Sequence, residues 1–433
     1  MKNDLNLTDF LKDVFSSFDK KVENSGLVSI CVEIPCIDLF QVYELLINQY
    51  PFSSFWEESD GISYIAFEKC KYVTLDGPKR FEVAKEFNSE NFKNLINLTN
   101  ESHNSALSKI IYLFSFSENL NNKNLPSDIP SLEAILPKIL ITKSGKNCWL
   151  RINGHVEGKS SLRTLIEEIW TIRNQVINSG SELIKSSGLK TSFDFLANRI
   201  KIKLKNKLDL VEILKRFKKK QPNTCRYVWK RNSKDILFGA SPEKLFSFSK
   251  PNLTLEALAG TISTNSNFKK LLKSTKDLKE HNYVIQHLIK SLEVSKITNF
   301  KKSDIKVNSF GDISHLQTLI FSKVENICPF ELLKNLHPSP AVCGYPKNAA
   351  LDWINTLESF PRGNYASPMG WVDSSGNASF LLAIRGARCI EENIEFTAGS
   401  GIVSGSVLEK EIDEIKLKFE SIVKQIFCAK NPR

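Results

Sequence analysis

The sequence predicts an α+β fold in a single large domain. Segments with strand patterning and segments with helical spacing follow one another without the regular strand–helix–strand alternation of a doubly wound parallel sheet. Near the C-terminus, the strands Phe380–Ile390 and Ile394–Ala398 flank a short turn and predict a hairpin. The amphipathic helix Val407–Phe427 follows it. The 433 residues contain no internal repeat, so the length is compatible with one sheet-based domain.

The first half of the chain predicts strands with short helices between them. Ser29–Ile34 and Ile62–Phe67 have strand patterning, and Asp38–Ile47 has helical spacing. Asn119–Pro130 is rich in Asn and Pro and predicts a surface loop. Leu162–Ser187 predicts a helix that ends before Gly188.

The second half predicts longer elements. Lys201–Leu208 is expected to be a strand and Asp209–Lys219 a helix. The strands Asp235–Ser241 and Lys244–Phe248 flank a turn at Ser241-Pro242. Leu271–Glu293 predicts one long helix.

Composition limits the classes of function. The net charge of +11 suits a nucleic-acid binder, a lysine-rich solvated surface or an anionic substrate. The basic run 199–220 lacks the aromatic platforms of single-strand binders, which favours the latter two. The nine cysteines form no CxxC pair, so a zinc site is not expected. Free thiols in a reducing cytoplasm are the expectation instead. The sequence contains no run of about 18 apolar residues, so a membrane span is not predicted.

Acidic side chains on two predicted helices form the first candidate site. Glu411, Glu414 and Lys418 lie three and four residues apart beside the apolar stripe of the last helix. That stripe consists of Ile412, Ile415, Phe419, Ile422 and Ile426. Glu280 borders the apolar face of the other long helix. Such carboxylates suit Mg²⁺, which binds few carboxylates and leaves positions for water and an anion, but they also suit surface salt bridges.

Two further residues carry candidate chemistry. Glu243 follows the Ser241-Pro242 turn, where it is either a proton donor with a raised pKa or a solvent-facing turn residue. Arg385 lies between two alanines on its predicted strand, with room to reach a ligand carboxylate or, alternatively, solvent. The glycines of Ala398–Gly401 suit an anion-binding loop or an ordinary tight turn.

Taken together, short motifs along the chain resemble the chorismate-utilising enzymes, which include the isochorismate, salicylate, anthranilate and aminodeoxychorismate synthases. They occur in the order of that family and are Gly239–Glu243, Ala257–Thr261, Glu280-His281, His315-Leu316, His337–Val342, Gly344–Lys347, Gly370–Asp373, Ala383–Arg385, Ala398–Val403 and Glu411–Lys418. The C-terminal half, residues 151–433, carries all of them. The N-terminal half, residues 1–150, matches weakly, around Phe52–Asp76.

The resemblance implies two antiparallel sheets flanked by helices, with the active site in the cleft between layers. It implies Mg²⁺ bound by Glu280 and Glu414, with Glu411 holding metal-bound water. Glu243 would be the general acid that protonates the departing C4 hydroxyl of chorismate. The implied substrate-binding residues are Gly260, Thr261, His315, Ala341, Tyr365, Arg385, Gly399, Gly401 and Lys418.

Within the family, the run His337–Val342 resembles isochorismate synthase most. The Thr-Val-Ser-Gly-Ala-Pro-Lys run typical of anthranilate-forming members is absent. The resemblance therefore implies isomerisation of chorismate to isochorismate for quinone, salicylate or siderophore biosynthesis. It also implies a cytoplasmic monomer that acts on a small molecule and binds neither nucleic acid nor membrane.

One position departs from the family pattern. Counting back from Glu243 places Phe193 where the family has the lysine that activates the attacking water. Lys190, three residues earlier, is the candidate substitute base, and Lys201 and Lys203, later in the chain, stay open if a register shift or bulge brings one of them in. Two alternatives stay open: an anthranilate- or aminodeoxychorismate-type enzyme that uses ammonia, and a catalytically impaired relative that binds chorismate.

Overall fold

The computed structural model describes residues 6–59, 61–100, 103–118, 129–178, 199–204, 208–358 and 360–427. The helices are α1 (Leu7–Lys21), α2 (Leu39–Leu46), α3 (Arg80–Asn94), α4 (Lys159–Asn178), α5 (Leu210–Lys220), α6 (Phe268–Lys273), α7 (Thr275–Val294), α8 (Pro329–Leu336), α9 (Lys347–Leu357) and α10 (Leu408–Phe427). The strands are β1 (Ser25–Ile34), β2 (Ser53–Glu57), β3 (Ser63–Leu75), β4 (Leu95–Asn97), β5 (Lys109–Phe114), β6 (Leu132–Ser144), β7 (Asn147–Glu157), β8 (Arg199–Lys203), β9 (Cys225–Asn232), β10 (Asp235–Ser241), β11 (Lys244–Ser249), β12 (Asn252–Ser263), β13 (Phe300–Lys302), β14 (Lys306–Phe310), β15 (Ile313–Lys323), β16 (Pro368–Asp373), β17 (Ala378–Leu382), β18 (Gly386–Ile390) and β19 (Asn393–Thr397).

The two expected sheets are present, and they join into one hydrogen-bonded network. The first sheet runs β4-β1-β7-β6-β3-β2-β9-β10-β18-β19-β8, and the second runs β5-β16-β17-β11-β12-β15-β14, with β13 also paired to β15. The long strands β3 and β6 belong to both sheets, because their pairing shifts register between Lys69 and Lys71. All pairs are antiparallel except β1 with β4.

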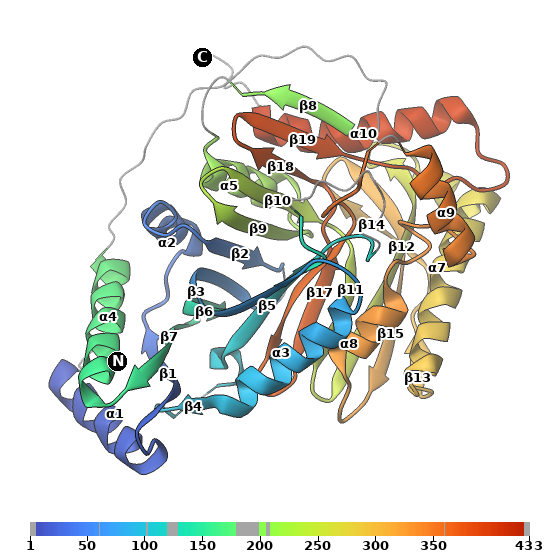
Figure 1. The fold of residues 1–433 in the computed structure, drawn as a ribbon. Coiled ribbons are helices and arrows are strands. Elements are labelled where there is room, and N and C mark those ends of the chain that lie inside the picture. The colour runs from blue at the N-terminus through green and yellow to red at the C-terminus, as the bar shows by residue number, and fades with distance from the viewer. Residues whose placement is uncertain are drawn as a thin grey trace.

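Three apolar clusters hold the layers together. One lies between the sheets and contains the large buried side chains Trp56, Trp229 and Trp371. A second covers the outer face of the first sheet with α1, α2, α4, α5 and α10, and a third covers the second sheet with α3, α7 and α8. In Figure 1 the α1 and α4 helices lie at the left edge and α7 and α8 at the right, with the strands between them.

The two halves of the sequence form one domain. β2 from the N-terminal half pairs with β9, and β5 pairs with β16. Because the strands of each half complete the sheets of the other, neither half has a separate core. No helix within the described ranges is long and apolar enough to cross a membrane.

Most predicted elements are confirmed within a few residues, including the β18–β19 hairpin and the strands around Ser241-Pro242. The predicted α2 and α5 begin after Asp38 and Asp209, whose side chains cap the free N–H groups of the first turn. The predicted helix from Leu162 ends at Asn178 in the described part of the chain. The predicted loop 119–130 and the segment 179–187 lie almost entirely outside the described residues.

Three predictions about elements are wrong. The expected helix Leu271–Glu293 is two helices, because Ser274 ends α6 and its hydroxyl caps α7 by accepting from the Asp277 N–H at 3.3 Å. The expected strand Phe380–Ile390 is interrupted between β17 and β18. In the stripe of α10, Phe419, Ile422 and Ile426 are buried, whereas Ile412 is exposed and its neighbour Glu411 is buried.

Candidate active site

A cavity of about 70 Å³ lies where β12, α7, α10 and the turn before β11 meet. The sequence predicted most of its walls, and the structure brings these residues together. The predicted residues that line it are Glu243, Gly260, Thr261, Glu280, His315, Ala341, Tyr365, Arg385, Gly399, Gly401 and Lys418. We call this space the candidate active-site cavity.

Glu243 is held in a rigid turn at the wall of this cavity. The Ser241 hydroxyl donates to the Leu382 carbonyl at 2.7 Å and accepts from the Glu243 N–H at 3.2 Å. The Glu243 carbonyl accepts from the Leu382 N–H at 3.1 Å. The turn therefore binds to the end of β17, and it directs a buried carboxyl group into the cavity rather than into solvent.

The surroundings of Glu243 favour its protonated form. Burial, and then the negative charge of Glu256, raise its pKa to about 8. Arg385 and Lys418 act in the opposite direction, but they do not outweigh burial. At neutral pH the group carries a proton that it can donate, which is the property that a general acid needs.

Arg385 reaches the cavity from a break between strands, not from a regular strand position as the sequence predicted. Its φ of 53° lies in the left-handed region, and its carbonyl accepts from the Ala240 N–H at 3.1 Å. An extended residue here would continue the β17 strand. The left-handed turn instead directs the buried guanidinium toward His315.

A short relay orients this guanidinium. His315 Nδ1 lies 2.9 Å from the Gly260 carbonyl, which can only accept, so Nδ1 carries the hydrogen. Nε2 is then the acceptor for Arg385 Nη2 at 3.0 Å. Burial lowers the pKa of His315 well below its usual value, which keeps the imidazole neutral and suited to this acceptor role.

Gly260 lies at an irregularity in β12. The register of β12 against β15 shifts between Ala259 and Thr261, and Gly260 has a φ of 69°. A Cβ atom here would lie 3.0 Å from Cβ of Asp277 on α7. The shift therefore brings a strand backbone close to α7 and exposes the Gly260 carbonyl to His315.

Glu280 lines one end of the cavity, and the carboxylate of Glu414, which is not among the lining residues, lies near enough to act on it. Glu414 accepts from Lys418 Nζ at 2.6 Å; burial alone would raise its pKa, but Lys418 and Thr261 lower it. Glu280 has no hydrogen bond or ion pair to any described residue. Burial and the charge of Glu414 raise its pKa to about 7.

These residues fit a divalent cation such as Mg²⁺. No three His, Cys, Asp or Glu side chains form a metal cage within the ranges described above. Mg²⁺ does not need one, because it is often held by one or two carboxylates together with water and an anionic ligand. Glu280 is a half-buried carboxylate without a direct ion pair to any described residue, and the charge of Glu414 opposes its ionisation, which is the situation that a cation relieves.

Glu411, predicted beside them, does not line the cavity. It is buried one turn before Glu414, where it pairs with Lys276 of α7 and accepts from the Ser400 hydroxyl. Burial would raise its pKa, but Lys276 and Ser400 outweigh it and lower the pKa. In this position Glu411 joins α7, α10 and the glycine loop around the cavity.

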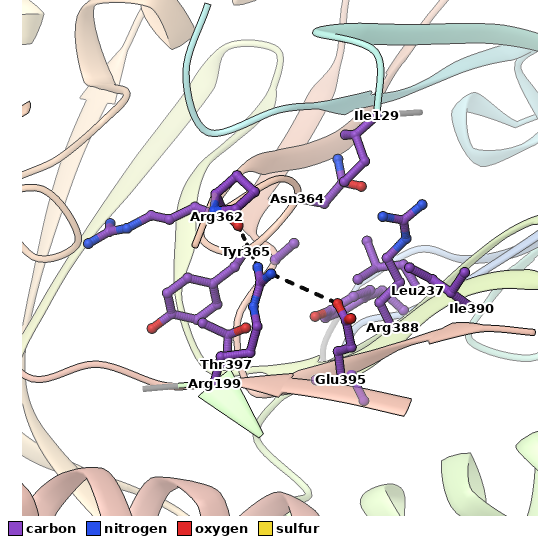
Figure 2. A pocket seen from close by; sticks show the side chains of 15 residues that line it. Ile129, Arg199, Leu237, Arg362, Asn364, Tyr365, Arg388, Ile390, Glu395 and Thr397 are labelled. Atoms are coloured by element: carbon purple, nitrogen blue, oxygen red, sulfur yellow. Dashed lines mark hydrogen bonds and ion pairs between the residues drawn. The ribbon is translucent and has the colours of Figure 1, made fainter. Parts of the chain in front are cut away.

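A larger cavity, of about 410 Å³, adjoins the first and shares Tyr365 and Thr397 with it. Figure 2 shows Arg199, Arg362 and Arg388 among the side chains around this neighbouring cavity. Arg199 donates to the Pro361 carbonyl at 2.5 Å and lies 4.0 Å from Glu395. The sequence did not indicate this cavity, since its residues come from distant segments.

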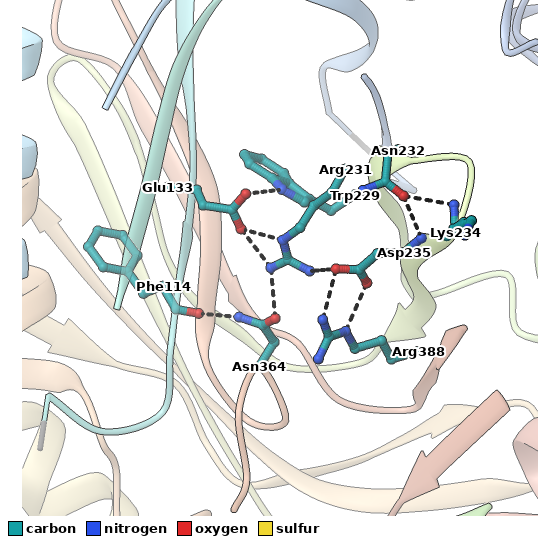
Figure 3. Close-up of polar contacts among 9 residues, drawn as sticks. All are labelled: Phe114, Glu133, Trp229, Arg231, Asn232, Lys234, Asp235, Asn364 and Arg388. Carbon is teal, nitrogen blue, oxygen red and sulfur yellow. Dashed lines mark hydrogen bonds and ion pairs between the residues drawn. The ribbon is translucent and has the colours of Figure 1, made fainter. Parts of the chain in front are cut away.

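A buried ionic network forms one side of the neighbouring cavity (Figure 3). Arg231 donates to Glu133 at 2.6 and 2.8 Å and to Asp235 at 3.1 Å. Asp235 also accepts two hydrogen bonds of 2.8 Å from Arg388. Because Arg231 donates to Asn364 as well, at 2.9 Å, the network positions the segment that carries Tyr365.

Two predicted residues cannot be placed in the site, and two residues near the site were not predicted. Lys190 and Phe193 lie outside the described residues. Sequence reasoning missed Glu256, beside Glu243, and Lys276, the partner of Glu411. The cue for Lys276 was its position one turn before Glu280, on the same helix face.

A model of a known protein family matches almost the whole sequence. The family model described as "Chorismate binding enzyme" matches residues 10–193 and 195–427. The chain belongs to the chorismate-binding enzyme family. The match covers both halves of the sequence, including the N-terminal half in which motifs were faint.

Two curated relatives carry the name isochorismate synthase. "Salicylate biosynthesis isochorismate synthase" of Pseudomonas aeruginosa is 34% identical over 201 residues, which are 44% of this chain and 42% of that protein. "Isochorismate synthase MenF" of Bacillus subtilis is 27% identical over 322 residues, 66% of this chain and 68% of that one. The first alignment therefore spans less than half of its relative's length.

Solved structures share the fold over nearly the whole chain. The Escherichia coli menaquinone-specific isochorismate synthase MenF superposes with a TM-score of 0.74 at 18% identity, covering 97% of this chain and 99% of that one. Anthranilate synthase component I of Streptococcus pneumoniae superposes with a TM-score of 0.67 at 16% identity, covering 84% and 92%. At these identities the likeness establishes the fold, and it does not distinguish between the two reactions.

Proposed function

We propose that the protein is an isochorismate synthase, which isomerises chorismate to isochorismate. The observation that carries the proposal is one cavity that combines the buried Glu243, whose raised pKa favours its protonated form, with Arg385, Lys418 and the carboxylate of Glu280. The names of the curated relatives support this reaction within the family. The product would supply quinone, salicylate or siderophore biosynthesis.

The reaction requires the residue types that line the cavity. Chorismate is a dianion, and Arg385 and Lys418 would bind its carboxylates, with Gly399 and Gly401 allowing close approach of the backbone. Glu243 would give its proton to the C4 hydroxyl, so that the C4–O bond breaks and water leaves. A second water would add at C2 and lose a proton to a base, which completes an isomerisation with no net change in composition.

Other cavity residues would shape and position the substrate. Gly260, Thr261 and Ala341 would line the ring pocket, and Tyr365 would contact a substrate carboxylate. His315 was expected to face the substrate, and its hydrogen bonds with Arg385 and Gly260 support a role in orienting Arg385 as well.

Magnesium is the proposed cofactor, and Glu280 and Glu414 would be its protein ligands. When bound, Mg²⁺ would neutralise the substrate's ring carboxylate and hold it in place. Glu411 would reach the ion only through water, which agrees with its place one helical turn away from Glu414. A test that does not depend on activity is isothermal titration of the protein with Mg²⁺ alone, in which Glu280→Gln should abolish the binding that wild type shows.

Lys190 is the proposed base for the attacking water. Lys190→Ala should then lower kcat at least about a hundredfold, as loss of a general base does. Lys12→Ala is the matched control, because Lys12 is exposed on α1 and pairs only with its helix neighbour Asp9 in the described residues. Unchanged kcat in Lys190→Ala would remove Lys190 from the mechanism.

The decisive experiment incubates the purified protein with chorismate and Mg²⁺ and separates the products by chromatography. Isochorismate as the product supports the proposal. An aminated product, either anthranilate or aminodeoxychorismate, formed only when ammonia is added would establish the anthranilate- or aminodeoxychorismate-type alternative. Chorismate binding without turnover under either condition would establish the impaired relative.

Glu243→Gln tests the assignment of the acid. The variant should bind chorismate with unchanged affinity and lose turnover, because the amide keeps the shape but donates no proton to a leaving hydroxide. Glu325→Gln, an exposed glutamate on the far end of the second sheet, is the control. Turnover that survives in Glu243→Gln would exclude Glu243 as the acid.

We also propose that the protein acts in the cytoplasm as a monomer. Free thiols agree with a reducing compartment, and they are Cys36, Cys70, Cys148, Cys225, Cys328, Cys343 and Cys389. Light scattering at micromolar concentration would check the oligomeric state, and a mass of about twice 49.1 kDa would contradict the monomer.

A further inference from the structure

A second carboxylate stands beside Glu243. Glu256 lies on β12 at an even spacing from Leu258 and Gly260, which line the candidate active-site cavity, so the three share one face of the strand. The Glu256 carboxylate lies 3.4 Å from the backbone N of Lys244, the residue that follows Glu243. Glu243 therefore lies at the cavity wall, and the charge of Glu256 lies behind that wall, close enough to act on Glu243.

The partners of Glu256 are hydrogen-bond donors. Gln317 Nε2 of β15 donates to one carboxylate oxygen, and the Lys244 N–H donates to the other. Both donors stabilise the ionised form of a carboxylate. The nearest ammonium, that of Lys244, is bound to Glu58 at 2.7 Å and does not neutralise Glu256 by a direct ion pair.

The Glu243 side chain is in a different situation. It makes no side-chain hydrogen bond to any residue in the described ranges. The charged and titratable groups that face it are Glu256 from β12, Arg385 from the break after β17, Lys418 from α10 and Tyr365 from the loop before β16. Of the two acids, Glu256 has the donors that favour ionisation and Glu243 has none.

We propose that Glu256 is a positioning residue whose fixed negative charge keeps Glu243 protonated at neutral pH, so that Glu243 is ready to give its proton to the substrate. The inference rests on the proposed role of Glu243 as the acid. It assigns the two carboxyl groups different states: Glu256 is the anion and Glu243 carries the proton. The negative charge of Glu256 opposes the ionisation of Glu243, because like charges near each other disfavour a second ionisation.

The effect of burial is consistent with this division. Burial raises the pKa of both acids. In Glu256 the hydrogen bonds from Gln317 and Lys244 limit the rise, although the pKa stays above its usual value. The proposal therefore assigns the first proton that the pair loses to Glu256 and the second to Glu243.

The test measures the pH dependence of kcat/KM in wild type and Glu256→Gln. The glutamine keeps the size of the side chain and removes the charge. Activity requires protonated Glu243, so it falls at high pH, and without the Glu256 charge this alkaline limb should move to lower pH by about one unit. Glu256→Asp retains the charge and should keep the limb close to that of wild type, and Glu325→Gln should leave it unchanged. An unmoved limb in Glu256→Gln would overturn the inference.

A second measurement does not depend on turnover. Infrared spectroscopy detects the carbonyl stretch of a protonated carboxyl group, and the band of Glu243 is the one that Glu243→Gln removes. Its loss with rising pH should occur at lower pH in Glu256→Gln than in wild type. A band that titrates at the same pH in both proteins would refute the role of Glu256. The two proposals can fail separately. If the infrared band titrates at lower pH in Glu256→Gln than in wild type, but wild type does not turn over chorismate, the proposed function is refuted and the inference about the pair stands.

Discussion

Replacing Glu280 by glutamine should make the metal-free protein more stable while abolishing its function. Burial and the neighbouring Glu414 raise the pKa of Glu280 from 4.5 to about 7, and none of the described residues pairs with it. An acid whose pKa is higher in the folded than in the unfolded protein destabilises the fold once it ionises. This cost is absent below pH 4.5, grows as the pH rises to 7, and is complete above it.

The size of the effect follows from the same values. A rise of this extent corresponds to at most about 3 kcal/mol of lost stability at pH 8, and the partial solvent exposure of Glu280 reduces the figure to about 2. Glutamine carries no charge, so the variant should gain about 2 kcal/mol at pH 8 and almost nothing at pH 4.5. A gain in stability on removing the charge is typical of a binding site whose charged group is unfavourable without its ligand. Removing one partner of a surface salt bridge lowers stability instead.

The assay is urea denaturation in the presence of a metal chelator at both pH values, with Glu325→Gln as the exposed control. Added Mg²⁺ should raise the stability of wild type and leave Glu280→Gln unchanged, because binding to the folded state stabilises it. A variant that is less stable than wild type at pH 8 would refute the argument and would favour an ordinary salt bridge at this position.

Three further perturbations test other parts of the structure. Asp235→Asn leaves Arg388 buried against a neutral amide and should lower the free energy of unfolding by about 3 kcal/mol in urea at pH 7; a loss below about 1 kcal/mol would contradict a buried network. Arg385→Lys keeps the charge but loses the planar fork, so kcat/KM for chorismate should fall at least about tenfold, and an unchanged value would exclude a bidentate grip. Gly260→Ala should lower the free energy of unfolding by about 1 kcal/mol more than Gly376→Ala does. Both glycines have positive φ, but only at Gly260 would a Cβ atom lie in close contact with a neighbour. Equal losses would show that the backbone conformation alone matters.

The types of the main elements could be predicted from local pattern. Strands on either side of the Ser241-Pro242 turn predicted β10 and β11, and helical spacing predicted α2 and α5, whose aspartate caps are seen in the structure. The break at Ser274 was missed, because apolar spacing continues from α6 into α7 and a serine is compatible with either a helix interior or a cap. The break at Arg385 was missed for a similar reason, since a strand pattern does not reveal a single residue with positive φ.

The sequence predicted which residues form the candidate site better than it predicted how those residues contact one another. The ordered motifs named most residues of the cavity wall, and the structure places them together. The state of each group was beyond the sequence. Whether Glu243 is protonated depends on Glu256, and whether Glu411 is free depends on Lys276, 135 positions away.

The sequence by itself determined the fold class, because residue spacing encodes which side chains share a helix face or a strand. The ordered motifs, through their resemblance to a known family, indicated the chorismate-binding enzymes and the chemical types in the site. Only the tertiary structure decided which carboxylate has a cationic partner, which nitrogen of His315 carries the hydrogen, and how Arg385 enters the cavity. These properties depend on burial and on contacts between distant segments. Strand register and helix packing create both, and local sequence does not specify either.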